Sequence, residues 1–220
     1  MKAIDLISQD IPPLRTSDSG ATALRWMGEF HVSHLPIVNE NQLLGLISEE
    51  DIFNAHGVEE PIGTLPLTFQ RPFIHDTEHA FEVLKLAAQL RLTVIPVIDE
   101  NENYVGSVTR DNLLNFLASE TDIIEPGGIL VLDLNLNDYS LSEISRIIEM
   151  AGAKVLSAFT KTNADTNKIE LTLKINQTQL QQVMAALNRY NYVVKESFVE
   201  PEYFEDLQQR YEGLMNYLNI

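Results

Sequence analysis

The sequence predicts an α+β fold composed of several small domains. A unit of about 60 residues occurs twice in the first 120 residues, and a different strand and helix pattern begins near residue 127. Within the repeat, apolar residues alternate between the 3.6-residue period of helices and the two-residue period of strands. The chain has 220 residues, 45% of them apolar, which is enough to bury a core in each of two or three domains.

The repeat appears when residues 33–54 are aligned with residues 93–116. With one extra turn residue in the second copy, two prolines and two glycines come into register: Pro36 with Pro96, and Gly45 with Gly106. Upstream, residues 17–30 align with residues 77–90. One supersecondary unit therefore occurs twice.

Each copy is predicted to follow the order β-α-β-β-α. Apolar residues at helical spacing predict its first helix, at Ala23, Leu24, Met27 and Phe30 and again at Val83, Leu84, Ala87 and Leu90. A β-hairpin follows, with a polar turn between two apolar runs. The second helix is predicted to begin near Glu49 in one copy and near Arg110 in the other.

Pro36 and Pro96 lie inside predicted strands. Proline has no N–H for a strand ladder, and it holds the preceding residue, Leu35 or Ile95, in an extended conformation. We therefore expect edge strands that leave backbone groups free for a ligand. An edge strand without a ligand also explains the prolines, and on this feature alone it is the favoured interpretation.

The third segment is predicted to follow the order βαββαβ. Its strands are expected at residues 129–136, 153–159, 168–175 and 192–198. Ser140 and Glu143 form a capping-box signature before one helix, and Asn176 is a candidate cap for the other. This order is that of a ferredoxin-like domain.

The C-terminal segment, residues 199–220, is predicted to be an amphipathic helix. Its apolar residues recur with heptad spacing at Phe204, Leu207, Tyr211, Leu214 and Leu218. Two heptads are too short for an independent coiled coil. Packing on its own subunit and packing across a dimer both remain open.

Composition excludes several classes of function. A net charge of −17 disfavours binding to nucleic acid or to anionic lipid. The absence of cysteine excludes disulfides and thiolate chemistry. There is no signal-peptide pattern and no apolar run of roughly 20 residues, so a soluble cytoplasmic protein is expected.

Candidate metal and catalytic residues are few. His75 and His79 are four residues apart and could share a helix face near Asp76, and His31 and His34 form a similar pair. Neither pair has a third ligand at suitable spacing. Phosphate-binding glycine loops and zinc-protease motifs are absent as well, so neither an enzyme nor a required cofactor is expected.

Each copy of the repeat has an apolar strand with a proline, a polar turn, an apolar strand with a glycine, and then Ser or Thr before an acidic or amide residue. This repeated pattern resembles the CBS domain. The resemblance predicts a tandem pair, residues 1–57 and 58–120, with pseudo-twofold symmetry. It implies clefts that hold adenosine-containing ligands such as AMP, ATP or S-adenosylmethionine. Residues 121–198 resemble an ACT domain, and this domain order is similar to the acetoin-utilisation B-type family.

In the first copy, the resemblance assigns four residues to ligand binding. Asp51 would accept hydrogen bonds from the ribose hydroxyls, and Ser48 would lie near the sugar or phosphate. His34, two residues before Pro36, would contact phosphate, and Leu35 would contribute its extended backbone. Ser48 and Asp51 are explained equally well as the start of a helix.

The second copy departs from this pattern. Thr109 matches Ser48, but Asn112 stands in place of the aspartate, and Val94 stands in place of the histidine. Arg110 could supply positive charge there, as could His75 and Arg71. We expect the first site to be the better nucleotide site.

The resulting hypothesis is a non-catalytic sensor that forms a homodimer and acts on a downstream protein that the sequence does not name. The loop at residues 135–143 lacks the glycine usual in amino-acid-binding ACT domains, so dimerisation is the expected role of this domain. The alternative is a scaffold protein whose ligand clefts are vestigial.

Overall fold

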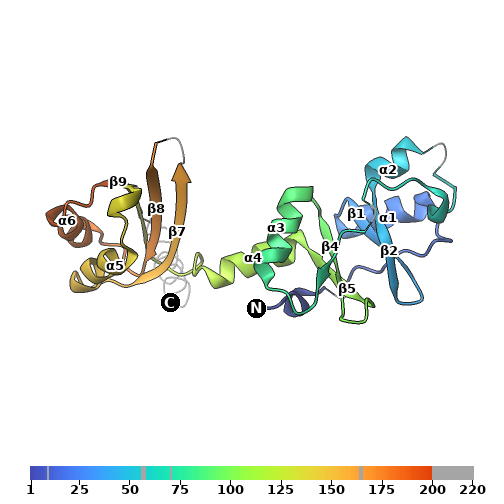
Figure 1. Cartoon of the computed structure of the whole chain (residues 1–220), viewed down its shortest axis with the longest axis horizontal. Coiled ribbons are helices and arrows are strands. Elements are labelled where there is room, and N and C mark those ends of the chain that lie inside the picture. Colours follow the sequence, from blue (N-terminus) through green and yellow to red (C-terminus); the bar gives the residue numbers. More distant parts are fainter. Residues whose placement is uncertain (9, 56–57, 70, 164–165, 200–220) are drawn as a thin grey trace, which may run out of the picture. The chain divides into compact units, whose positions relative to one another are not determined.

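The computed structural model describes residues 1–199, except positions 9, 56–57, 70 and 164–165. The chain divides into two compact units, of which the first comprises Met1–Leu117 and the second begins at Ala118 (Figure 1). Both contain helices and strands, which confirms the predicted α+β class. The predicted C-terminal helix lies outside the described residues, apart from Val199, which ends a strand.

The first unit contains both copies of the repeat. The first copy comprises α1 (Gly20–Phe30), β1 (His34–Asn39), β2 (Gln42–Ser48) and α2 (Glu49–Asn54). The second comprises β3 (Ile74–His75), α3 (Ala80–Leu90), β4 (Val94–Ile98), β5 (Tyr104–Thr109) and α4 (Arg110–Glu120). Short 3-10 turns lie at Ala3–Leu6 and Ile62–Thr64. The predicted helix, hairpin and helix are confirmed in both copies. The predicted leading strand is present only in the second copy, as β3; in the first copy Leu14 forms a single parallel bridge to Ile37.

The two copies also share local geometry. His31 and Arg91 end α1 and α3 in the left-handed conformation, with φ of 54° and 56°. Both hairpins are antiparallel, and each has a bulge in its second strand, where Leu44 and Val105 are the extra residues. The hairpin turns place Glu40 and Glu102 at positive φ. The sequence repeat is therefore a structural repeat as well.

The prediction of edge strands at the prolines is wrong for β4. This strand lies between β3 and β5, with Pro96 opposite Ser107 on β5. The parallel contact with β3 starts at Val97, one residue past the proline. In the first copy, the carbonyl of Pro36 accepts a hydrogen bond from Leu14 N at 2.8 Å. The backbone next to the prolines is thus largely paired within the chain.

The hydrophobic cores of the two copies exchange side chains. Ala3 and Leu6, at the start of the chain, pack into the core of the second copy, as does Leu46 from β2. In return, Val94 from β4 packs into the core of the first copy, together with Ile62 from the connecting segment. Packing therefore crosses the boundary that the sequence predicts between residues 57 and 58.

Gly106 allows the N-terminal segment to approach β5. Ser8 N donates a hydrogen bond to Ser107 O at 2.9 Å, which fixes the segment beside the strand. Gly106 has φ of +152°, and a Cβ there would clash with the side chain of Ile7. A glycine is needed at this position because another chain segment passes directly over it.

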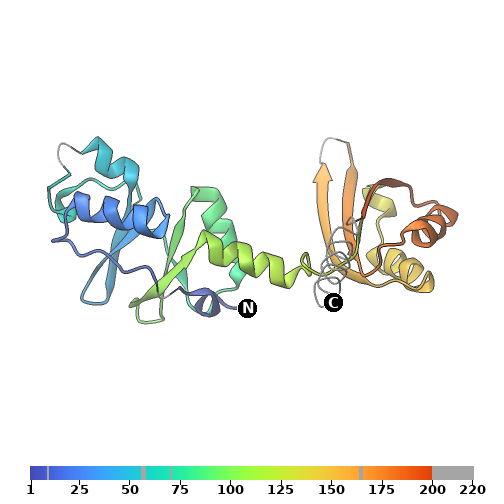
Figure 2. The same ribbon diagram turned by 180° about the vertical axis from the view of Figure 1, so that it is seen from behind.

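The second unit contains a four-stranded sheet. Its elements are β6 (Gly128–Asn135), a 3-10 turn (Leu136–Asp138), α5 (Leu141–Met150), β7 (Val155–Asn163), β8 (Lys168–Ile175), α6 (Gln181–Arg189) and β9 (Val194–Val199). The strand order is β7-β8-β6-β9, and every neighbouring pair is antiparallel. Helices α5 and α6 lie on the same face of the sheet (Figures 1 and 2). The predicted ferredoxin-like βαββαβ arrangement, which is that of an ACT-like domain, is confirmed.

Two predicted helix caps differ from the structure. Ser140 caps α5 by accepting a hydrogen bond from Glu143 N, but the Glu143 carboxylate binds Tyr192 Oη at 2.8 Å instead of completing the capping box. Asn176 does not cap α6, which begins at Gln181. Its Oδ1 instead accepts a hydrogen bond from Lys154 N at 2.7 Å. In both cases the side chain that the local pattern assigns to the cap forms a hydrogen bond with a residue distant in the sequence.

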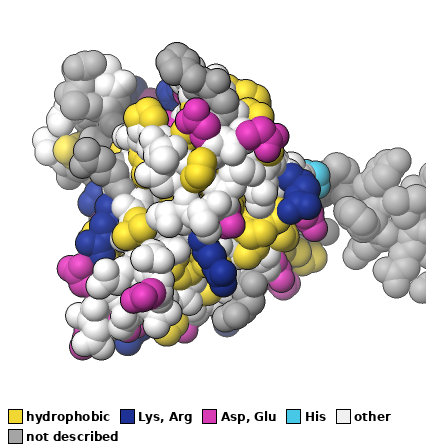
Figure 3. All heavy atoms as spheres, turned by 90° about the vertical axis from the view of Figure 1, so that its right-hand side faces the viewer, with side chains coloured by type: hydrophobic (Ala, Val, Ile, Leu, Met, Phe, Trp, Pro, Cys, Tyr) yellow, Lys and Arg dark blue, Asp and Glu magenta, His cyan; other side chains and the backbone are white. Residues whose placement is uncertain are grey.

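On the face shown in Figure 3, acidic side chains are interspersed with lysine, arginine and apolar side chains. Among the described helices, none has both the length and the apolar character that a bilayer crossing requires.

Candidate functional site

His34 lies at the start of β1, in contact with the second copy of the repeat. Its Nδ1 is 2.9 Å from Thr93 Oγ1 and accepts a hydrogen bond from Thr93 N at 3.3 Å. Thr93 Oγ1 in turn accepts from Ser33 N at 2.9 Å. Because Nδ1 accepts from Thr93 N, it carries no proton in this arrangement, and the threonine hydroxyl is then the donor in its contact with the imidazole. The ring also lies against Phe69, with 5.8 Å between centroids. His34 is buried and held by partners within the chain.

This environment favours the neutral imidazole. Burial lowers the pKa of His34 below its usual value. The nearby Asp51 raises it, while Arg110 lowers it further. Protonation of Nδ1 would also abolish the hydrogen bonds that Thr93 donates. His34 is therefore poorly suited to act as a cationic phosphate contact near neutral pH.

Ser48 and Asp51 form a capping box at the start of α2. Ser48 Oγ accepts a hydrogen bond from Asp51 N at 3.1 Å, and Asp51 Oδ2 accepts from Ser48 N at 2.9 Å and from Ser48 Oγ at 2.8 Å. Asp51 Oδ1 accepts from the amide and the hydroxyl of Thr68, which follows 17 residues later. The side chain thus joins the helix to the connecting segment.

Asp51 has little capacity left for a ligand. A carboxylate offers about four acceptor positions, and four donors from the chain already occupy them. The residue is 5% exposed. Burial would raise the pKa of Asp51, but the hydrogen bonds from Thr68 and Ser48 outweigh it and lower the pKa. The side chain of Leu35 is fully buried in the core of the first copy, and the residue is paired with Ile47 on β2, so a contact between its backbone and a ligand stays a prediction.

The residues of the second copy border an open cavity of about 390 Å³. Thr109, Arg110 and Asn112, which the sequence analysis singled out, all line it. The full lining is Ser8, Asp10, Ile11, Phe30, His31, Val32, Thr93, Thr109, Arg110, Asp111 and Asn112. The volume is within the range of about 300–1,000 Å³ that is typical of small-molecule sites.

Thr109 and Asn112 repeat the helix cap of the first copy, but with an amide. Asn112 Oδ1 accepts a hydrogen bond from Thr109 N at 3.1 Å and another from the Thr109 hydroxyl. The Asn112 side-chain nitrogen makes no hydrogen bond with the described residues, so its two N–H groups are available to a ligand. In the first copy, the corresponding atom is a carboxylate oxygen already bound to Thr68.

The lining combines three kinds of chemistry. Arg110 stands at the N-terminus of α4, where the helix dipole also favours negative charge. Asp10 and Asp111 supply carboxylates that can accept hydrogen bonds from hydroxyl groups. Apolar side chains complete the wall, at Ile11, Phe30 and Val32. Such a cavity suits a ligand with an anionic group, hydroxyls and an apolar ring.

The sequence analysis missed part of this lining. Ser8 and Asp10 come from the N-terminal segment, whose contact with β5 has no periodic signal in the sequence. The glycine at position 106 was the available clue, since it marks a close approach by another segment. Two residues proposed as sources of charge lie elsewhere: Arg71 pairs with Glu102 at 3.0 Å, and the His75 ring packs edge-on against Phe73.

A metal site finds no support among the described residues. No group of three or more histidine, aspartate and glutamate side chains there is arranged to hold a metal ion. His79 instead caps α3 by accepting a hydrogen bond from Phe81 N at 3.2 Å.

The ACT-like domain has a separate cavity of about 600 Å³ beside the glycine-free loop that follows β6. Tyr192 and Glu143 both line it, and Tyr192 Oη donates a hydrogen bond to Glu143 Oε2. Burial raises the pKa of Tyr192 to about 12, and the carboxylate of Glu143 adds to the rise. That this domain serves dimerisation and not amino-acid binding stays a prediction.

Comparison with known proteins gives matches to part of this chain. An uncharacterized protein of Methanocaldococcus jannaschii, MJ1232, is 26% identical over 94 residues, which are 42% of this chain and 31% of that protein. This chain thus matches about a third of that relative's length.

Two solved structures are also similar to part of this chain. A CBS domain pair/ACT domain protein from Thermotoga maritima has 19% identity and a TM-score of 0.49, over 54% of this chain and 98% of that one. CBSX2 in complex with AMP has 20% identity and a TM-score of 0.45, over 54% of this chain and 96% of that one.

The family comparison covers both copies of the repeat. Residues 3–57 and residues 67–119 each match the CBS domain. The two matches correspond to the two copies that the structure shows, with the same helix–hairpin–helix order. Residues 3–119 of the chain therefore contain a tandem pair of CBS domains.

Proposed function

We propose that this chain is a non-catalytic regulatory protein whose CBS pair binds an adenosine-containing ligand: AMP, ATP or S-adenosylmethionine. The cavity at Thr109, Arg110 and Asn112 is the proposed site. The observation that carries the proposal is the combination of a cationic helix N-terminus, free amide donors and an apolar wall in one cavity of suitable volume.

For each part of such a ligand, the cavity lining has residues of suitable chemistry. The adenine ring suits the apolar side chains of Ile11, Phe30 and Val32. The ribose hydroxyls suit Asp10 or Asp111 as acceptors. A phosphate or carboxylate suits Arg110, the start of α4 and the free N–H groups of Asn112.

The proposed signal is a shift between two arrangements of the CBS pair. The cavity is lined by the N-terminal segment, the end of α1 and the start of α4, so ligand contacts join parts of both copies. A ligand that binds one arrangement more tightly will populate it. The ACT-like domain would then hold two chains together in a cytoplasmic homodimer, which presents the change to a downstream protein.

Isothermal titration of the full chain with AMP, ATP and S-adenosylmethionine tests the proposal. We expect one molecule of the preferred ligand to bind per chain, and the Arg110→Ala variant to bind it at least tenfold more weakly. Arg25→Ala, which removes an exposed arginine of α1, is the matched control and should leave affinity unchanged. No heat with any of the three ligands at millimolar concentration would reject the site.

One observation favours the scaffold alternative. Asp51, the residue that best matches the ligand motif, is engaged within the chain, and Asp10 and Asp111 oppose the approach of an anion. A scaffold would bind none of the three ligands, and its stability would not change when they are added. Thermal unfolding with and without ligand separates the two functions, since a bound ligand raises the melting temperature.

A further inference from the structure

Thr93 lies between His34 of the first copy and the cavity of the second copy. Its hydroxyl is 2.9 Å from His34 Nδ1, and its amide N–H donates to the same nitrogen at 3.3 Å. Thr93 is also one of the residues that line the cavity. A single residue therefore connects the buried imidazole with the wall of the proposed ligand site.

The carbonyl of Thr93 extends this connection to α4. It accepts a hydrogen bond from Arg110 N at 3.0 Å, and Arg110 is the first residue of α4 and lines the same cavity. The first copy has the equivalent hydrogen bond, in which Ser33 O accepts from Glu49 N at 3.1 Å. In each copy this carbonyl therefore holds the start of the second helix.

The symmetry of the two copies is broken at the next residue. His34 aligns with Val94, which has no side-chain acceptor and packs in the core of the first copy. Ser33 N donates to the hydroxyl of Thr93 at 2.9 Å, whereas Thr93 N donates to the imidazole of His34. The contact between the copies therefore contains one titratable group, and that group touches a residue of the second-copy cavity.

The hydrogen bonds assign the protonation state of His34. Because Nδ1 accepts from an N–H group, it carries no proton, and the neutral ring has its proton on Nε2. A second proton can be added only at Nδ1. Two N–H groups would then face each other at the distance of a hydrogen bond, so the ring and Thr93 would have to separate.

The groups that surround His34 come from several elements. Burial has the largest effect on the pKa of His34 and lowers it. Asp51 and Glu49 on α2 raise this pKa, and Arg110 on α4 lowers it. Phe69, which follows α2 in the connecting segment, lies against the ring and carries no charge. The neutral ring is therefore the stable form near pH 7, and acid is the condition that changes it.

We propose that His34 is a positioning residue for the ligand cavity of the second copy and that it acts through Thr93. The neutral imidazole holds Thr93, and Thr93 holds the first residue of α4, so Arg110 keeps its place in the cavity wall. Protonation of His34 releases Thr93 and loosens this wall. The effect on ligand binding rests on the proposed function, but the effect on the wall does not require a ligand.

The two events must then oppose each other. If protonation of His34 weakens ligand binding, a bound ligand makes the protonation of His34 harder by the same factor. Ligand affinity is therefore expected to fall in acid. Replacing the imidazole by a side chain that accepts hydrogen bonds but does not titrate should remove this dependence.

NMR spectra of the full chain without ligand test the connection between His34 and the wall. Between pH 7.5 and 5.5, we expect the backbone amide signals of Thr93 and Arg110 to shift together with the ring signals of His34. An imidazole that does not titrate in this range would overturn the proposal. Amide signals that do not follow the ring would overturn it as well.

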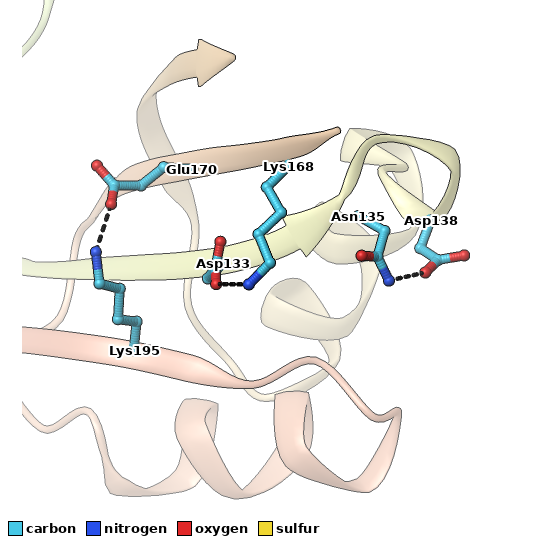
Figure 4. Close-up of polar contacts among 6 residues, drawn as sticks. All are labelled: Asp133, Asn135, Asp138, Lys168, Glu170 and Lys195. Atoms are coloured by element: carbon cyan, nitrogen blue, oxygen red, sulfur yellow. Dashed lines mark hydrogen bonds and ion pairs between the residues drawn. The ribbon is translucent and has the colours of Figure 1, made fainter. Parts of the chain in front are cut away.

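The ACT-like domain is the internal reference for these spectra. All five histidines of the chain lie at or before position 79, outside this domain. The polar contacts shown in Figure 4 involve only carboxylates, lysines and an amide, such as Asp133 with Lys168 and Glu170 with Lys195. These groups have reference pKa values far from this pH range, so the amide signals of Lys168 and Lys195 should not shift.

Titration calorimetry measures the consequence for ligand affinity, with whichever of AMP, ATP and S-adenosylmethionine binds the natural chain most tightly. At pH 7.5, His34→Leu leaves Thr93 N without its acceptor and should weaken binding at least about threefold, the scale of one hydrogen bond. His34→Asn keeps an acceptor and should restore most of the affinity. His79→Leu is the matched control, because that imidazole also accepts a backbone N–H, from Phe81 at 3.2 Å, outside the cavity.

The pH profile separates positioning from a general loss of stability. Between pH 7.5 and 5.5, the affinity of the natural chain should fall at least about threefold relative to that of His34→Asn. Comparing the two chains with the same ligand cancels the titration of the ligand itself. Parallel profiles for the two chains would overturn the proposal.

Failure of this proposal differs from failure of the proposed function. If none of the three ligands binds the natural chain at pH 7.5, the proposed function fails, and the NMR spectra alone decide the role of His34. If a ligand binds and His34→Leu weakens its binding no more than His79→Leu does, the proposed function stands and the role of His34 is refuted.

Discussion

In both CBS copies a side-chain cap starts the second helix, but the surroundings of the two caps differ. In the first copy, the capping aspartate is tied to Thr68, and Phe69 lies against the neighbouring histidine. In the second, the capping asparagine has a free amide and faces a cavity of about 390 Å³. The connecting segment closes over one cap, and no described segment does the same over the other.

This difference shows that a preserved motif does not by itself mark an available site. Asp51 matches the ligand-binding pattern best, yet its acceptor positions are filled by the chain. Asn112 departs from the pattern, yet it keeps donors free. The geometry thus favours the second site over the first, the order opposite to the one expected from sequence. Five experiments can break or sharpen the comparison.

The largest expected effect is on stability, from Asp51→Ala. The change leaves the buried donors of Ser48 and Thr68 without an acceptor, so we expect the free energy of unfolding to fall by about 2–3 kcal/mol. Asn112→Ala removes the equivalent cap in the second copy and should cost about 1 kcal/mol. Urea unfolding of both variants measures the difference in the free energy of unfolding. Equal losses in the two variants would contradict the prediction.

The pH dependence of Asp51 follows from its lowered pKa. A carboxylate with a folded-state pKa below its unfolded value stabilises the protein fully above the unfolded pKa. That stabilisation is lost as the pH falls through the lower, folded-state pKa. The difference in stability between the natural chain and Asp51→Ala should therefore shrink in acid.

The next effect is on ligand affinity, and it separates the two sites. If the ligand lies in the second-copy cavity, Arg110→Ala should weaken AMP binding by about 1.5–3 kcal/mol, the scale of a charged hydrogen bond. Thr68→Val, which removes one donor to Asp51 in the first copy, should leave AMP affinity unchanged. Titration calorimetry gives both values. A larger loss of AMP affinity for Thr68→Val than for Arg110→Ala would indicate that the ligand binds in the first copy.

A smaller effect is expected from Asn112→Asp. The substitution keeps an acceptor for Thr109 but replaces the free amide donors with a third carboxylate beside Asp10 and Asp111. Binding of AMP should weaken by about 1 kcal/mol relative to binding of uncharged adenosine. Paired titrations with AMP and adenosine report this ratio. Stronger AMP binding would mean that the position contacts ribose hydroxyls and not phosphate.

The smallest effect is the titration of His34. Its folded-state pKa lies below the unfolded value near 6.5, so unfolded chains take up the proton first. Stability should decline as the pH falls from about 6.5 to the folded-state pKa, and level off below it. His34→Asn, which keeps an acceptor for Thr93, should flatten this dependence. Unfolding curves between pH 7.5 and 5.5 would show it, and an unchanged slope would contradict it.

Sequence analysis predicted most of the fold because the fold follows local periodicity. The order of helices and strands in all three domains came from apolar spacing and turn residues. Ser140 was recognised as a cap because a cap lies within one helical turn of its donor. Where the partner is distant, the prediction failed: Glu143 bonds to Tyr192, and Asn176 to Lys154.

The candidate site was predicted only in part for the same reason. Thr109, Arg110 and Asn112 could be aligned between the copies, and all three line the cavity. The tie between Asp51 and Thr68 joins residues 17 positions apart in a segment without periodicity. Likewise, nothing near Ser8 in the sequence indicates that it reaches β5, a hundred residues later.

The exchange of core side chains between the CBS copies has a consequence for how the pair comes apart. A fragment ending at residue 57 would expose Ala3, Leu6 and Leu46 and would lack Val94. Neither half has a complete interior, so the smallest cooperative unit is the pair. Melting of one half removes part of the interior of the other, and the two should unfold in a single transition. A molecule that binds beside α4 therefore raises the melting temperature of α1 and α2 as well.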